Sequence, residues 1–173
     1  MKWLRIFGCL AVLIVPILVA AQQPSAADTL LNRMTGKWIL KGVIDGKNIQ
    51  HHINAEWVLG HQYLQLNERS DEKQSNGAPS QDAIVLICYN NKSMQYDCLW
   101  LDNTSNGGLS NGIIAHAKFQ ANTLALLFKY SDKSFFHTTF TFNPNENTWH
   151  WKMEGDENGK MEPFAEAEMS KME

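Results

Sequence analysis

Hydrophobic and polar residues alternate with a period of two along most of the chain from residue 36 onward. In the first such run, Trp38 and Leu40 fall on one face, and Lys37 and Lys41 fall on the other. Successive side chains of a β-strand point to opposite faces, so this alternation predicts half-buried strands. The predicted strands are 36–44, 47–59, 61–70, 82–90, 94–103, 110–119, 122–130, 134–143, 148–154 and 160–169.

The links between these strands are short, and none contains a helix long enough for a crossover connection. Consecutive strands with short links pair with each other in antiparallel order. A meander of about ten strands removes its exposed edges when its first and last strands also pair. The pattern therefore predicts an all-β fold, an antiparallel up-and-down β-barrel of about ten strands.

A short amphipathic segment precedes the first strand. Asp28 can cap a helix that carries Leu30, Leu31 and Met34 on one face. We expect this helix to cover one end of the barrel, where Trp38 fills the narrow floor.

The strands at 82–90 and 94–103 are apolar at almost every position. A strand with this composition is buried on both faces, so an element outside the lumen should cover this hairpin. The N-terminal helix is the candidate for that cover.

The first 21 residues follow a different pattern. Lys2 and Arg5 precede an apolar run that ends in Ala20-Ala21, which is the order of a secretory signal peptide. Pro16 interrupts the run, and a spanning helix needs about 20 apolar residues. We therefore expect cleavage after residue 21, export to the periplasm or the extracellular space, and no stable membrane insertion afterwards. The expected organisation is a signal peptide at 1–21, a flexible leader at 22–28 and one barrel domain at 29–170.

Net charge narrows the range of partners. The 173-residue chain has a formal charge of −3, and loss of Lys2 and Arg5 with the signal peptide changes it to −3 − 2 = −5. An acidic product without a basic cluster lacks the electrostatic footprint of a nucleic-acid binder. We expect no nucleic-acid partner.

Several short stretches, in this order, resemble a family of secreted bacterial proteins with a lipocalin-like domain of unknown function. They are Gly-Lys-Trp at 36–38, Glu-Trp-Val-Leu-Gly-His-Gln-Tyr-Leu at 56–64, Cys-Leu-Trp-Leu-Asp at 98–102, His-Ala-Lys at 116–118 and Trp-His-Trp-Lys-Met at 149–153. The resemblance covers roughly residues 29–170 and implies a lipocalin-like barrel of the calycin type. It implies no catalytic residues.

A looser resemblance connects the chain to the nitrobindin-type haem barrels, which share the glycine–tryptophan opening of the first strand. Those proteins use a histidine near the C-terminus as the iron ligand. No histidine follows His150 in this chain. The resemblance therefore implies the barrel but not the haem, and we expect no cofactor.

Histidines are the first candidates for chemistry. His51 falls on the same face of its strand as Ile53 and Trp57, which predicts an inward side chain. We assign His116 and His137 to the lumen as well. Each histidine could contact a ligand or could be satisfied by a backbone carbonyl or a hydroxyl. None has the local spacing of a metal site.

Carboxylates are a second group. Glu56 and Asp102 lie next to tryptophans, and Asp97 interrupts an apolar strand. A buried acid with a raised pKa is a candidate general acid, whereas an acid on a solvated outer face needs no function. We assign no catalytic residue.

Aromatic residues are the third group. Trp149 and Trp151 share one face, and Phe136 and Phe140 share another. The lumen of a ten-stranded barrel is wider than side chains alone fill, so some of these rings should line a cavity for a small hydrophobic or aromatic ligand. The candidate ligand-binding residues are Trp38, His51, Trp57, Trp100, His116, His137, Trp149 and Trp151.

Two alternatives to a binding protein remain open. One is an enzyme that uses an inward histidine with a carboxylate or a metal. The other is a structural or envelope-interaction protein with a solidly packed barrel.

Cys88 and Cys98 would remain after signal cleavage and lie on consecutive predicted strands. An oxidising compartment permits a disulfide between them, although directly paired strand positions suit disulfide geometry poorly. The alternative is two small buried thiols.

Overall fold

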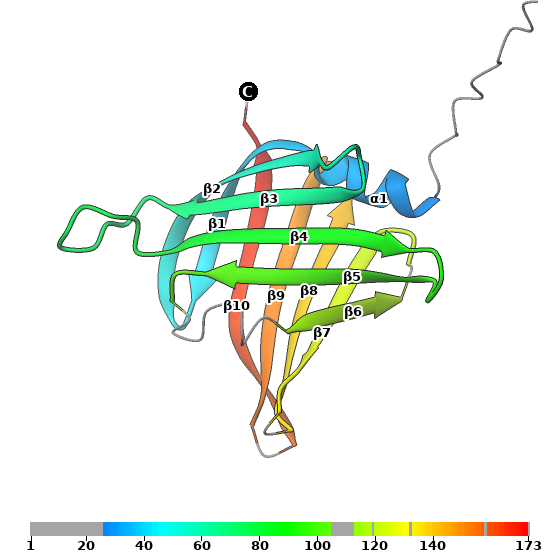
Figure 1. Cartoon of the computed structure of the whole chain (residues 1–173). Coiled ribbons are helices and arrows are strands. Elements are labelled where there is room, and N and C mark those ends of the chain that lie inside the picture. The colour runs from blue at the N-terminus through cyan, green and yellow to red at the C-terminus, as the bar shows by residue number, and fades with distance from the viewer. Residues whose placement is uncertain (1–25, 105–112, 119, 132, 158, 173) are drawn as a thin grey trace, which may run out of the picture.

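The computed structural model describes residues 26–104, 113–118, 120–131, 133–157 and 159–172. Within these residues the chain forms one short helix and a closed barrel of antiparallel strands (Figure 1). The elements are α1 (Ala26–Met34), β1 (Gly36–Ile44), β2 (Lys47–Val58), β3 (Tyr63–Ser70), β4 (Asp82–Asn90), β5 (Gln95–Asp102), β6 (Ile114–Lys118), β7 (Thr123–Lys129), β8 (Phe135–Asn143), β9 (Thr148–Glu157) and β10 (Lys160–Lys171). The expected signal peptide at 1–21 lies outside the described residues.

Each strand pairs with its neighbour in the sequence, and β1 pairs with β10 to close the ring. The up-and-down barrel is therefore confirmed. The third strand begins later than expected, because Leu59, Gly60 and His61 adopt positive φ angles in the turn before it. The sixth strand was expected at 110–119; it is described at Ile114–Lys118, and residues 105–112 and 119 lie outside the described part.

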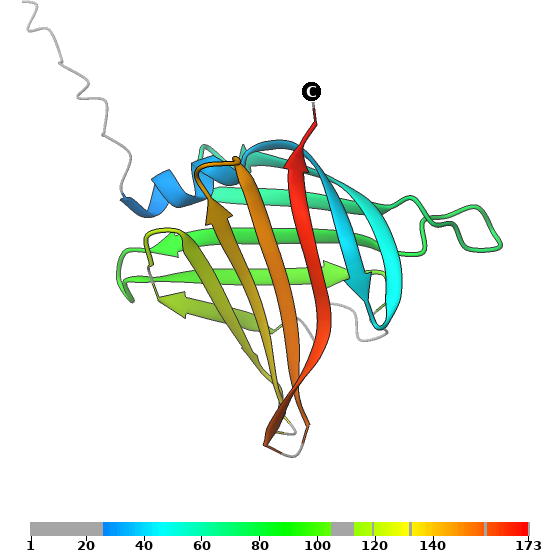
Figure 2. The same cartoon turned by 180° about the vertical axis from the view of Figure 1, so that it is seen from behind.

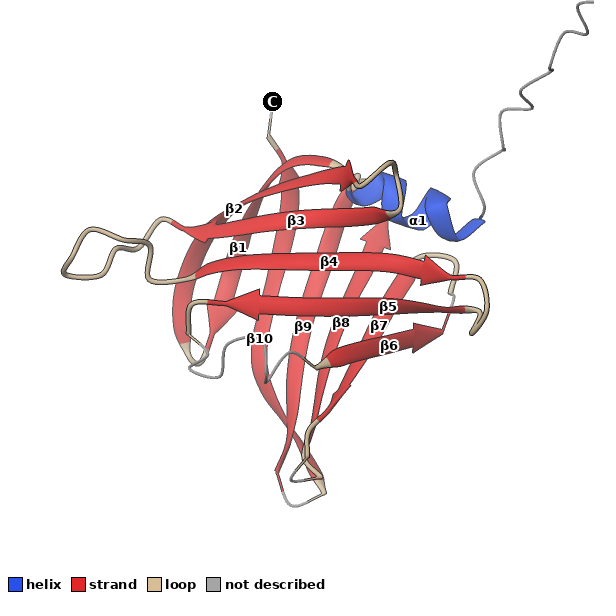
Figure 3. Cartoon of the chain, in the orientation of Figure 1, coloured by secondary structure: helices blue, strands red, loops and turns tan. Residues whose placement is uncertain are grey.

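The strands form two walls that run in different directions. β3, β4 and β5 run side by side in one wall, and β8, β9 and β10 run at a steep angle to them (Figure 1). Figure 2 shows from behind that β1 continues this second wall beyond β10. The blue helix of Figure 3 lies at the end where β1 begins, which we call the closed end. The opposite end, where β1, β5, β7 and β9 finish, is called the open end.

Helix α1 closes its end of the barrel as expected. Leu30, Leu31 and Met34 are buried and belong to the same core as the inner faces of the strands. Trp38 is completely buried beneath the helix, and its Nε1 donates a hydrogen bond to the backbone oxygen of Met34 at 2.7 Å. Asp28 lies within α1, which is described from Ala26, so its expected role as the N-terminal cap is wrong. No helix among the described residues combines the length and the apolar character needed to cross a membrane.

The seam between β1 and β10 depends on a glycine. A Cβ atom at Gly42 would lie 2.2 Å from the backbone oxygen of Glu166 and 2.4 Å from Cα of Ala167. Both distances are far inside van der Waals contact, so the two strands can approach this closely only because residue 42 has no side chain.

The outer face of the β4–β5 hairpin is not covered by α1. Ile84 is 45% exposed there, and Leu86, Leu99 and Leu101 are half-buried. The expectation that the helix covers this hairpin is therefore wrong, because α1 is used to close the end of the barrel instead.

Candidate functional site

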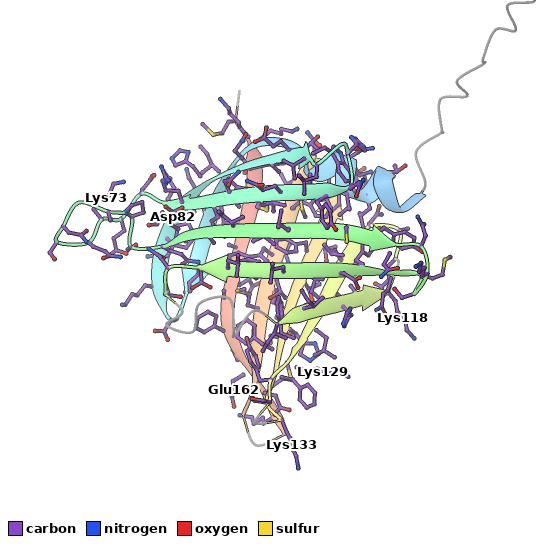
Figure 4. The ribbon with its side chains drawn as sticks, in the orientation of Figure 1. Lys73, Asp82, Lys118, Lys129, Lys133 and Glu162 are labelled. Atoms are coloured by element: carbon purple, nitrogen blue, oxygen red, sulfur yellow. The ribbon has the colours of Figure 1, made fainter. Side chains whose placement is uncertain are left out.

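A cavity of about 950 Å³ occupies the lumen at the open end, and we call it the mouth cavity. Its apolar walls come from strand ends on several sides of the ring and include Ile44, Trp100, Phe128, Phe136 and Met153. Figure 4 labels Lys129, Lys133 and Glu162 around the hairpin tips at this end. The size and the apolar side chains of the inner wall are typical of sites for small molecules.

Three aromatic rings form a parallel stack that begins at the cavity wall and continues behind it. The ring centroid of Trp151 lies 6.1 Å from that of Trp100 and 6.0 Å from that of Phe140, with interplanar angles of 10° and 9°. Trp151 is 1% exposed, whereas Trp100 is half-buried and lines the cavity. Offset parallel stacking at this spacing holds the rings in place, so Trp100 presents a fixed flat surface.

One polar side chain in the cavity wall has no partner. Thr138 is 0% exposed and lines the mouth cavity, yet its Oγ1 makes no hydrogen bond within the described part of the chain. The Nε1 atoms of Trp149 and Trp151 are also buried without a partner among the described residues. Buried polar groups are normally hydrogen-bonded, and an unsatisfied one costs about 1–3 kcal/mol. Thr138 is therefore a candidate hydrogen-bonding group for a molecule in the cavity.

His51 and Glu68 form a second polar feature of the lumen. Both side chains are 3% exposed, and Nδ1 of His51 lies 2.5 Å from Oε1 of Glu68. The inward direction expected for His51 is confirmed, but neither residue lines the mouth cavity. Sequence reasoning missed Glu68, although Leu64, Leu66 and Glu68 alternate along β3 and so share the inner face.

His116 lies on the outside of the barrel, so its expected place in the lumen is wrong. Its side chain is 52% exposed, and its Nδ1 lies 2.8 Å from Oδ1 of Asp97. The inner positions of β6 are Ala115 and Ala117. Ala117 pairs with the fully buried Tyr96, whose large side chain occupies the lumen and leaves room only for a small neighbour.

Asp97 and His116 form a polar cluster on the outer surface. Burial acts to raise the pKa of Asp97, but hydrogen bonds from Asn90 and His116, together with the charge of His116, outweigh burial and lower it. Asp97 is therefore a stabilised carboxylate and not a general acid with a raised pKa. Glu56 is exposed, and Asp102 stands at the edge of the mouth cavity.

His137 also faces outward, half-buried on the outer face of β8, so its assignment to the lumen is wrong. The inner face of β8 carries Phe136, Thr138 and Phe140. The reason is hydrophobic burial, because turning His137 inward would move these phenylalanines to the solvent side.

The remaining tryptophans lie at the closed end. Trp57 is half-buried, donates a hydrogen bond from Nε1 to Oδ1 of Asn32 at 2.6 Å, and stacks on His61 with ring centroids 4.0 Å apart. Trp149 is 0% exposed and packs against Phe142. Of the predicted ligand-binding residues, Trp100 lines the mouth cavity and Trp151 supports it from behind. Trp38, Trp57 and Trp149 do not line this cavity.

Cys88 and Cys98 are free thiols, so the possible disulfide between them is wrong. Cys98 pairs with Ile87, and Cys88 pairs with Asp97. This offset of one residue places Cys98 on the inner face and Cys88 on the outer face of the sheet, where their sulfur atoms cannot meet. Burial raises the pKa of both thiols, and the charge of Asp97 adds to this effect at Cys88.

The described residues contain no group of three histidine, cysteine or acidic side chains that could hold a metal ion. Comparison of the chain with models of protein families and with curated proteins finds no match. The candidate site is therefore defined by its geometry, which is a mouth cavity with apolar side chains and a stacked aromatic ring in its wall and with the unpartnered hydroxyl of Thr138.

Proposed function

We propose that this chain is an exported lipocalin-like barrel that binds a small hydrophobic or aromatic molecule in the mouth cavity. The observation that carries the proposal is the cavity itself, about 950 Å³ with Trp100, Phe128, Phe136 and Met153 in its walls. A barrel with a solidly packed interior, one of the alternatives, would have no such space. Burial of an apolar molecule against these rings supplies a favourable free energy of about 25 cal/mol per Å².

Titration with the uncharged fluorescent dye N-phenyl-1-naphthylamine tests this function. We expect a blue-shifted emission that saturates at about one dye per barrel. Trp100→Leu should weaken binding because it removes the flat wall of the cavity. Trp57→Leu is the matched control, since Trp57 is also half-buried but lies at the closed end.

A charge at the mouth provides an independent test. Phe164 lines the cavity and is 41% exposed, so Phe164→Glu should fold normally but place a carboxylate against the apolar ligand. Met161 is 40% exposed and does not line the cavity, so Met161→Glu should leave binding unchanged. Failure of the wild-type protein to bind the dye, or equal affinities for all four variants, would contradict the proposal.

Export is a separate part of the proposal and rests on the charged, apolar and small-residue order of residues 1–21. We expect the exported protein to begin at or near Gln22. N-terminal sequencing that finds Met1 on the exported protein would contradict this part alone.

A second candidate function is an enzyme that uses His51 as a base oriented by Glu68. The buried contact of 2.5 Å between them favours it, because such a carboxylate fixes the tautomer and the orientation of an imidazole. Turnover of chromogenic esters by the wild-type protein, lost in His51→Gln, would support the enzyme. Binding of the dye without turnover of any ester would support the binding protein.

A further inference from the structure

Thr138 occupies a special place in the mouth cavity. Four polar or charged residues are buried among the described residues: His51, Glu68, Ser70 and Thr138. His51 and Glu68 bond each other, and Oγ of Ser70 bonds Oγ of Ser80 at 2.9 Å. Thr138 alone among the four lines the mouth cavity, and it alone lacks a hydrogen-bond partner within the described part of the chain.

The neighbours of Thr138 give its hydroxyl nothing to bond. Thr138 pairs with Leu126 on β7 and with Met153 on β9, both of which have apolar side chains. The flanking inner positions on its own strand are Phe136 and Phe140. A valine would fill the same volume here without the cost of an unsatisfied hydroxyl. The packing of the barrel alone therefore gives no reason for a hydroxyl at this position.

The surroundings also restrict the charge of that molecule. No buried charged side chain lines the cavity in the described residues; the charged lining residues, Asp102 and Lys129, belong to the strand ends at the open end. An ion next to Thr138 would lose its hydration without a buried counter-ion, which costs far more than one hydrogen bond returns. The loss of hydration costs an uncharged polar group much less free energy.

We propose that the ligand of the mouth cavity is an uncharged aromatic molecule with a hydroxyl or carbonyl oxygen, and that this oxygen hydrogen-bonds Oγ1 of Thr138 while the ring lies along Trp100. A threonine hydroxyl both donates and accepts, so it matches either oxygen. This inference rests on the proposed binding function and adds the chemical class of the ligand.

Displacement of N-phenyl-1-naphthylamine by three probes of similar shape tests the inference. The probes are 2-naphthol, which carries the hydroxyl, naphthalene, which lacks it, and naphthalene-2-carboxylate, which is charged at neutral pH. Thr138→Val should weaken the binding of 2-naphthol about five-fold, the usual effect of one hydrogen bond. It should leave the affinity for naphthalene unchanged. Thr138→Ser should keep the wild-type preference. The carboxylate should bind more weakly than 2-naphthol in every variant.

Thr139→Val is the matched control, because Thr139 is the next residue and lies on the opposite, outer face of β8. It should change the affinity of none of the probes. Thr138→Val should also unfold at a higher temperature than the wild-type protein when no ligand is present, since it removes a buried unsatisfied hydroxyl. Should that variant fail to fold, Thr138→Ala lacks the same hydroxyl and must show the same loss of preference.

The outcomes separate the two proposals. Suppose that the dye binds, but Thr138→Val lowers the affinities for 2-naphthol and naphthalene equally or lowers neither. The binding function then stands, and the role of Thr138 is overturned. If the carboxylate binds most tightly, the uncharged ligand class is overturned. If the dye does not bind the wild-type protein at all, the binding function fails and this inference fails with it.

Discussion

His51 on β2 and Glu68 on β3 bond each other inside the barrel, with Nδ1 of the imidazole 2.5 Å from Oε1 of the carboxylate and both side chains 3% exposed. A carboxylate or an imidazole alone at this depth would have no partner to replace water. Each of the two residues is therefore tolerated in the core because of the other.

Glu68→Ala should lower the free energy of unfolding by about 3–5 kcal/mol, because it leaves His51 buried and unpaired. The double change His51→Leu with Glu68→Leu should cost much less than the sum of the single changes, since it replaces both partners by apolar groups. Urea denaturation of the wild type, His51→Leu, Glu68→Leu and the double variant measures this coupling.

The adjacent pair on the outer face is the control. His52 and Asp71 lie 3.0 Å apart, with side chains 45% and 47% exposed. Asp71→Ala should cost no more than about 1 kcal/mol because solvent screens this pair. Equal costs for Glu68→Ala and Asp71→Ala would show that burial of the inner pair does not strengthen it.

Trp38→Ala should lower the free energy of unfolding by about 3–5 kcal/mol, the usual cost of removing a large buried aromatic side chain. Trp38 is 0% exposed and anchors α1 through the 2.7 Å hydrogen bond to Met34. Trp38→Phe keeps most of the side-chain volume, so it should lower the free energy of unfolding much less. A denaturation midpoint for Trp38→Ala equal to that of the wild type would contradict the role of the indole as the floor of the barrel.

Gly42→Ala should destabilise the barrel by about 1–3 kcal/mol, as overpacking of a close backbone contact typically does. The added Cβ would meet the backbone of Glu166 at 2.2 Å, so β1 and β10 must move apart. Gly155→Ala is the matched control, because its Cβ would meet only the ring of Phe136 at 3.6 Å, which is ordinary contact. Thermal unfolding of both variants tests whether the close approach at the seam is specific to Gly42.

Cys98 should make the protein less stable at alkaline pH. Burial raises the pKa of its thiol above the ordinary value of 9.0. Above about pH 9 the unfolded chain therefore releases this proton while the folded protein keeps it, so the free energy of unfolding falls as the pH rises, by up to about 1.4 kcal/mol per pH unit. Comparison of the wild type with Cys98→Ala at pH 8 and pH 10 isolates the effect. If the free energy of unfolding falls equally in the two proteins between pH 8 and pH 10, Cys98 contributes nothing to this pH dependence.

The strands were predictable because their alternation and their turns are local properties of the sequence. β1 and β4 begin and end as expected, and the other strands differ by a few residues at their ends, apart from β6, whose expected ends lie outside the described residues. The closure of the ring followed from the short links, which leave only neighbouring strands within reach.

The direction of individual side chains was harder to predict. In β6, the assignment of His116 to the lumen also places Ile114 inward, because the two residues share a face, but Ile114 is 44% exposed and the alanines face the lumen. Which face of β6 points inward depends on Tyr96 of β5, which fills the adjacent space. The alternation within β6 carries no information about that neighbour. Thr138 was missed for a related reason, since a single threonine between phenylalanines signals a site only when its neighbours across the sheet are known to be apolar.

The seam between β1 and β10 also sets the order in which the molecule can be completed. Thr35 and Lys171 are 136 positions apart, and the ammonium of Lys171 donates a hydrogen bond to the backbone oxygen of Thr35. A chain emerging from the ribosome can form its hairpins one after another, but it remains an open sheet with two unpaired edges until β10 has been made. Such edges pair readily with other chains, so the nascent protein is most exposed to aggregation just before its last strand arrives. Helix α1, which covers the closed end, is synthesised before any strand of the ring.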